Sequence, residues 1–222
     1  MSKASNYINM VKVKANKISS VSIETNKYKK AAKLLFDSLS ESKLEKKSAG
    51  DKHFLANNYQ KSVSSAFESL DLKVYSSPKI SLKSGKAIPA KFFDLLVSNS
   101  ENNRHLLIEV KSSTGGFNGL AAALLAIIIS RKAGISISAG NGAEIEVNNK
   151  NIKYILLIGT ECSNDLSKFD ELRKIFLPRS RNVEAFAIYP QKCKDDRANF
   201  EEISKFIRKQ AVFLLNLPTQ KK

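Results

Sequence analysis

The apolar positions along the chain predict helices that alternate with short strands. Residues three and four apart share one face of a helix, and this spacing links Tyr28, Ala31, Ala32, Leu35 and Leu39. It also predicts a helix over 54–70 and a terminal amphipathic helix over 201–215. The almost continuous apolar stretch within 119–132 predicts a helix that is buried on most sides.

Short apolar runs bounded by polar, Gly or Pro residues predict strands over 72–75, 91–98, 104–111, 154–160 and 183–189. The polar turn 99–103 joins the second of these strands to the third, so we expect them to pair as a hairpin. Residues 79–86 predict a loop or an edge hairpin, and Gly140-Asn141-Gly142 predicts a turn within 135–147. The fold class is therefore α/β (α+β), with a central mixed sheet flanked by helices.

Three charged residues interrupt the two strands of this hairpin. Asp94 lies within an apolar and aromatic run, and Glu109 and Lys111 follow Leu106-Leu107-Ile108. Residues two apart in a strand point to the same side, so Glu109 and Lys111 share a face. A tight hairpin would bring Asp94 alongside Glu109, where two carboxylates and one ammonium meet at the end of a sheet.

Such a group suits phosphodiester hydrolysis. Two carboxylates are hard oxygen ligands that fit Mg²⁺, with Mn²⁺ as a substitute. The ion can polarise a phosphate and lower the pKa of a bound water, while Lys111 stabilises the developing charge or orients the attacking water. The alternative is structural: Asp94 is a paired buried acid, and Glu109 and Lys111 belong to a solvated strand face.

The motif F-D-x(14)-E-V-K resembles the active-site signature of the PD-(D/E)xK nuclease superfamily, which includes type II restriction endonucleases and archaeal Holliday-junction resolvases. The resemblance covers roughly residues 54–160. It implies a restriction-endonuclease-like core, Asp94, Glu109 and Val110 as metal-contacting positions, and Lys111 as a catalytic residue. Phe93 stands where relatives often have Pro, and Gln60 stands where many have a metal-binding Glu, so Gln60 is the expected third ligand and Glu68 the next candidate.

The charge points to a polyanionic partner. The chain of 222 residues carries 37 Lys and Arg against 21 Asp and Glu, a formal net charge of +16, which favours nucleic acid. Residues 1–52 are a basic arm and helix with a net charge of +7, and residues 53–222 are the expected nuclease domain. Arg179 and Arg181, with Asn118 in the Gly-rich loop, are the first candidates for DNA contacts.

Two features that the sequence lacks indicate where the protein is located. The longest apolar run, Leu120 to Ile129, is ten residues, whereas a membrane span needs about 20. The first ten residues lack a secretory pattern, and the two cysteines, Cys162 and Cys193, are too few for a disulfide scaffold. We therefore expect a cytoplasmic protein that does not enter the membrane.

The sequence thus predicts a Mg²⁺-dependent endonuclease for double-stranded DNA, of the restriction type and acting as a homodimer. The alternatives are a junction resolvase and a non-catalytic basic nucleic-acid-binding protein. His105 lies on the same side of its strand as Glu109, but we expect it to be a surface residue.

Overall fold

The structure, a computed structural model, describes residues 26–37, 51–82, 93–111, 124–131, 134–138, 144–148, 150–158, 170–171, 173–175, 177, 182–187 and 196–217. Five strands form the main sheet in the order β1 (Lys73–Ser76), β3 (Leu95–Asn99), β4 (Arg104–Lys111), β7 (Ile152–Ile158) and β8 (Val183–Ala187). β3 is antiparallel to both of its neighbours, β1 and β4, whereas β7 and β8 run parallel to β4. The predicted α/β class and mixed sheet are confirmed.

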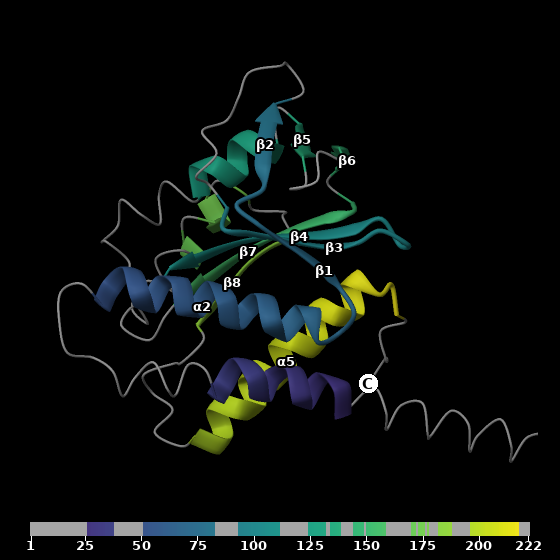
Figure 1. Cartoon of the computed structure of the whole chain (residues 1–222). Coiled ribbons are helices and arrows are strands. Elements are labelled where there is room, and N and C mark those ends of the chain that lie inside the picture. Colours follow the sequence, from purple (N-terminus) through teal and green to yellow (C-terminus); the bar gives the residue numbers. More distant parts are fainter. Residues whose placement is uncertain are drawn as a thin grey trace, which may run out of the picture.

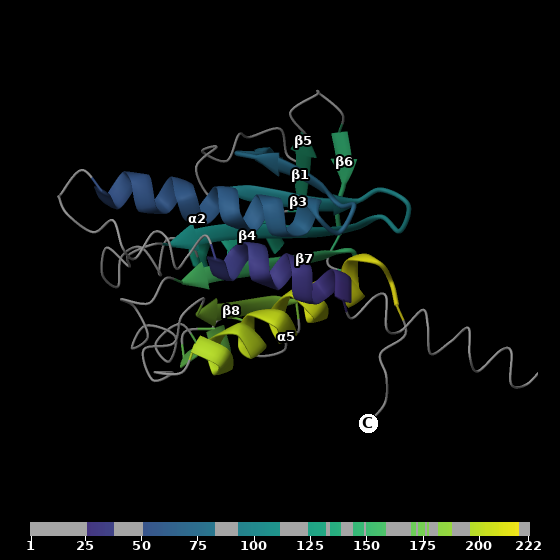
Figure 2. The same ribbon diagram turned by 60° about the horizontal axis from the view of Figure 1, so that its bottom comes forward.

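Three helices cover one face of this sheet (Figures 1 and 2). They are the helix over 26–37, α2 (Asp51–Glu68) and α5 (Asp196–Leu214). The predicted apolar stripe of the first helix is buried: Tyr28, Ala31, Ala32 and Leu35 are at most 5% exposed and join one cluster with α2, α5 and the sheet. The helix over 26–37 thus packs into the same core as α2.

The opposite face is covered by the helix over 124–131 and by a second sheet (Figure 1). This sheet has the order β2 (Lys79–Leu82), β5 (Ile135–Ser138) and β6 (Glu144–Glu146), and it is antiparallel. The sequence predicted a loop or an edge hairpin for 79–86, and neither prediction included this pairing. Residues 79–82 form a strand that pairs with a segment more than fifty positions later, and a local pattern carries no information about that partner.

The alternation of β4 decides which of its side chains face each layer. Leu106, Ile108 and Val110 belong to the cluster under α2 and α5, and Leu107 belongs to the cluster on the other face. By the same alternation, Glu109 lies on the face of Leu107, toward the second sheet. None of the helices in the described ranges is long and apolar enough to cross a membrane.

The half-buried Glu184 links α5 to the sheet through polar contacts. Glu184 on β8 lies 2.9 Å from the Lys209 ammonium and accepts a 3.1 Å hydrogen bond from the Gln210 amide. The Lys153 ammonium on β7 is 3.5 Å from the same carboxylate. Burial raises the pKa of Glu184, but the hydrogen bond from Lys209 and the charge of Lys153 outweigh it and hold the pKa below its usual value.

The prediction that His105 is a surface residue is wrong. His105 is 2% exposed and pairs directly with Ser98 across the β3–β4 hairpin. Its Nε2 lies 2.8 Å from Asn103 Oδ1, an acceptor, so Nε2 carries the proton. Nδ1 then accepts from the Ser98 hydroxyl at 3.0 Å. With both ring nitrogens bonded, the neutral ring can be buried, and burial lowers the pKa of His105 to about 4.

We expect this histidine to make the folded state sensitive to acid. Its pKa falls from 6.5 to about 4 on folding, so the unfolded chain takes up the proton first. The associated stability is complete above pH 6.5 and is lost as the pH falls toward 4, up to about 3 kcal/mol. Urea unfolding at several pH values measures the loss. His105→Gln should flatten the curve; parallel curves for wild type and His105→Gln would rule this explanation out.

Candidate active site

The hairpin register brings Asp94 and Glu109 together. The last pair of the β3–β4 ladder is Leu95 with Ile108, so Asp94 and Glu109 are the next residues beyond it on the two strands. The Asp94 amide donates to the Ile108 carbonyl at 2.9 Å, one residue out of register with the ladder, so the regular pairing of β3 with β4 ends at Leu95. The sequence predicts Asp94 in the middle of a strand, but β3 begins at Leu95. Asp94 therefore lies immediately before the strand. Its side chain is consequently half-buried.

Asp94 is held by further hydrogen bonds on both sides. The Val110 amide donates to Asp94 Oδ2 at 2.7 Å, which ties the carboxylate to the strand that carries Glu109. The main-chain carbonyl of Asp94 accepts from the Ser77 amide at 2.8 Å and from Gln60 Nε2 at 3.1 Å. Three segments of the chain therefore fix this residue, and a carboxylate that accepts one such bond can accept others.

Glu109 is the more deeply buried of the two acids, at 5% exposed. Its register partner on β7 is Leu156, and Leu107 lies two residues earlier on the same strand. A carboxylate in such apolar surroundings is ionised only when a cation or hydrogen-bond donors compensate the lost hydration. A second carboxylate nearby adds repulsion. A cation held between the two acids would supply such compensation.

Gln60 is brought to this site by α2, although α2 covers the other face of the sheet. Its amide nitrogen bonds the Asp94 carbonyl, as described above, which leaves its side-chain oxygen as the atom that could ligate a cation. Glu68 lies two turns further along α2, where its carboxylate accepts a 2.9 Å hydrogen bond from the Ser64 hydroxyl.

The remaining predicted positions differ in what the structure describes. Val110 is 7% exposed, with its side chain in the core under α2 and α5, so only its main chain can serve the site. The backbone of Lys111 ends β4 opposite Ile158, but its side chain lies outside the described residues. Asn118, Arg179 and Arg181 also lie outside them.

The acids at this site number two. In the described ranges, no three or more His, Cys, Asp or Glu side chains gather as a metal-binding group. The oxygen donors available are the carboxylates of Asp94 and Glu109, the Gln60 amide oxygen and main-chain carbonyls. All are hard ligands, and this donor set fits a Mg²⁺ ion that keeps several of its waters.

Ser77 is a part of the site that the sequence did not reveal. Its φ of 47° is in the left-handed region, which is unfavourable for a residue with a side chain. This conformation follows β1, where the Ser77 amide meets the Asp94 carbonyl. Because Ser77 acts through its main chain, no side-chain pattern could have marked it.

Comparisons with protein-family models, with curated proteins and with solved structures found no match to this chain. Any function inferred for this protein therefore depends on its fold and on this site.

The Val110–Asp94 bond can be tested through stability. Asp94→Ala should destabilise the protein by about 1–3 kcal/mol, because it leaves the Val110 amide without its acceptor. Asp94→Asn retains an acceptor oxygen of the same shape, and we expect it to cost less than half as much. Urea denaturation measures both variants. Equal losses would mean that the amide bond does not hold the carboxylate in place.

Proposed function

We propose that this protein is a Mg²⁺-dependent endonuclease that hydrolyses double-stranded DNA, most like a type II restriction endonuclease. The observation that carries the proposal is the bond from the Val110 amide to the Asp94 carboxylate at 2.7 Å, which ties Asp94 to the end of β4 that carries Glu109. If Asp94 had only a structural role, a partner that compensates its charge would be enough. The end of β4 instead carries a second carboxylate, Glu109.

The order of the elements supports the proposal. A helix, α2, precedes an antiparallel group of three strands, of which the second follows Asp94 and the third carries Glu109-Val110-Lys111. The helix over 124–131 follows, and after the strands β5 and β6 of the second sheet β7 returns parallel to β4. This is the order that the resemblance to the PD-(D/E)xK superfamily implies for a restriction-endonuclease-like core. Such a likeness concerns the fold, so the site must carry the function.

Each residue then has a defined part in hydrolysis. Asp94 and Glu109, with the Gln60 oxygen and the Val110 carbonyl, would hold Mg²⁺, and Mn²⁺ could substitute. When bound, the ion supplies charge to the scissile phosphate and acidifies a coordinated water. Lys111, two residues beyond Glu109, orients the attacking water or stabilises the charge that develops on the phosphate. The Val110 amide and Gln60 keep Asp94 oriented.

The overall charge supports a DNA substrate. The net charge of +16 matches a polyanion, and lysines act mainly on phosphates without reading sequence. A restriction-type enzyme would act as a homodimer, because a two-fold assembly matches a palindromic DNA site.

Cleavage should depend on each member of the constellation. Asp94→Asn, Glu109→Gln and Lys111→Ala should each reduce Mg²⁺-dependent nicking or linearisation of plasmid DNA by at least about a hundredfold, as loss of a preorganised electrostatic group does. These changes remove charge with little change in shape for the two acids, so DNA binding should largely persist.

Matched controls come from the opposite end of the molecule. Asp71→Asn and Glu101→Gln change exposed acids and should cleave like wild type. Discrete bands would indicate a restriction enzyme, whereas cleavage only of branched substrates would indicate a resolvase. Undiminished cleavage by Asp94→Asn or Glu109→Gln would refute the proposal.

Gln60 should set the metal requirement. A neutral amide attracts a cation less than a carboxylate does, so wild type should need millimolar Mg²⁺. Gln60→Glu should lower the Mg²⁺ concentration for half-maximal cleavage several-fold, although it loses the bond to the Asp94 carbonyl. Gln60→Ala, which loses the same bond without adding a ligand, is the control and should slow cleavage more than it weakens DNA binding. Identical Mg²⁺ titrations for all three proteins would exclude Gln60 from the metal site.

A further inference from the structure

A polar groove runs along the outer side of α2, next to the edge strand β1. It encloses about 440 Å³ and is lined by Asn57, Gln60, Lys61, Ser64, Ser65, Glu68 and Ser76. Every one of these side chains is polar or charged. These side chains suit a hydrated, hydrogen-bonding ligand.

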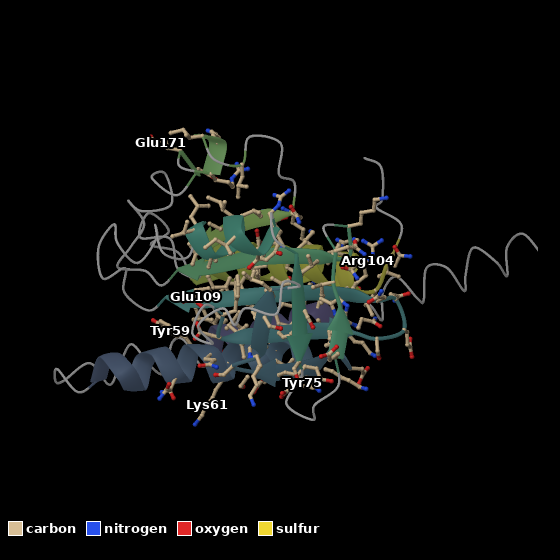
Figure 3. All side chains as sticks on the ribbon, turned by 90° about the horizontal axis from the view of Figure 1, so that it is seen from above. Tyr59, Lys61, Tyr75, Arg104, Glu109 and Glu171 are labelled. Carbon is tan, nitrogen blue, oxygen red and sulfur yellow. The ribbon has the colours of Figure 1, made fainter. Side chains whose placement is uncertain are left out.

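The groove reaches the candidate active site at two of its lining residues. Gln60 bonds the Asp94 carbonyl through Nε2 at 3.1 Å. Ser76 immediately precedes Ser77, whose amide bonds the same carbonyl at 2.8 Å. In Figure 3, Lys61 and Glu109 lie toward the same end of the molecule, and Arg104 lies at the opposite end of β4. A chain-like ligand in the groove would therefore pass directly beside Asp94.

The lining residues form two rows on α2. Asn57, Lys61 and Ser65 are four residues apart, and so are Gln60, Ser64 and Glu68, so each row follows one side of the helix. From Asn57 to Glu68 the rows extend about 16 Å along the helix axis. One DNA strand carries a phosphate about every 3.4 Å of axis, so the groove is long enough for several nucleotides.

The donors in these rows are those that contact phosphate and sugar oxygens. The rows supply an ammonium from Lys61, two amides from Asn57 and Gln60, and two serine hydroxyls; Ser76 on β1 adds a third hydroxyl. Such side chains make most protein contacts to a DNA backbone. The one acid, Glu68, is exposed and is bonded by Ser64 at the end of its row. Its charge would repel a phosphate from that end.

We propose that this groove holds the sugar–phosphate backbone of the DNA strand next to the scissile phosphate, with Lys61 and Asn57 as its principal contacts. The proposal names the substrate-binding surface of the proposed nuclease and rests on that function. Glu68 limits the affinity, so the two charged residues of the groove should have opposite effects on binding.

The test measures binding without cleavage. A fluorescein-labelled 20-base-pair duplex is titrated with full-length protein in Ca²⁺, and fluorescence anisotropy gives the dissociation constant at several salt concentrations. Lys61→Glu should weaken binding about tenfold or more and reduce the salt slope by about one. Asn57→Ala should weaken binding a few-fold, and Glu68→Gln should strengthen it by at least about twofold.

The controls carry the same charge changes at the other end of the sheet. Lys150→Glu and Glu101→Gln alter exposed residues near the start of β4, where Arg104 bonds the Lys150 carbonyl. Both should change binding less than twofold. If each control matches its groove variant, net charge alone explains binding and the groove proposal is overturned, as it is if the wild-type protein does not bind the duplex.

The groove and the catalytic assignment can fail separately. Binding that follows the groove variants while Asp94→Asn cleaves normally would retain the groove and reject the active site. Loss of cleavage in Asp94→Asn, with no effect of Lys61→Glu or Glu68→Gln on binding, would retain the active site and reject the groove.

Discussion

The hydrogen bond from the Val110 amide to the Asp94 carboxylate is the interaction on which the candidate site depends. It joins the start of one strand to the end of its neighbour, at the place where the β3–β4 ladder stops. Without it, a half-buried carboxylate at a strand mouth could turn toward solvent. With it, the carboxylate faces the strand that carries Glu109, and the Gln60 and Ser77 bonds to the Asp94 carbonyl hold the backbone in the same position.

This bond is effective because the layers on both sides of the sheet are rigid. Buried apolar side chains fill the space under α2 and α5 on one face and under the second sheet on the other, and such packing leaves little freedom for β3 and β4 to shift. The alternation of β4 then decides that Val110 enters the core while Glu109 does not. The same sheet thus places Val110 in the core on one face and Glu109 on the other.

Local patterns predicted what local physics determines. The bounds of β4 follow from its apolar run and flanking turn, and the stripe Tyr28, Ala31, Ala32 and Leu35 is buried because helical spacing leaves no other face for it. The position of Asp94 beside the end of β4 follows from a short hairpin with a tight turn. In each case the residues that decide the structure lie within one or two elements of one another.

The features that the sequence did not reveal depend on distant partners. The pairing of β2 with β5 joins segments far apart in the chain, and the burial of His105 requires Ser98 and Asn103 to satisfy both ring nitrogens. Gln60 could be placed on a helix, but its bond to a main-chain carbonyl 34 residues away is a result of tertiary packing. The polar rows of α2 have an amphipathic pattern that sequence reasoning interprets as a solvent face.

The central claim is that Asp94 and Glu109 together hold a divalent cation. Electron paramagnetic resonance of free Mn²⁺, titrated into the wild-type protein and into Asp94→Asn and Glu109→Gln, tests it without DNA or turnover. The account predicts that the wild-type protein removes Mn²⁺ from the free pool with saturation, that excess Mg²⁺ reverses this, and that either substitution abolishes it. Unchanged Mn²⁺ binding in both variants would contradict the account.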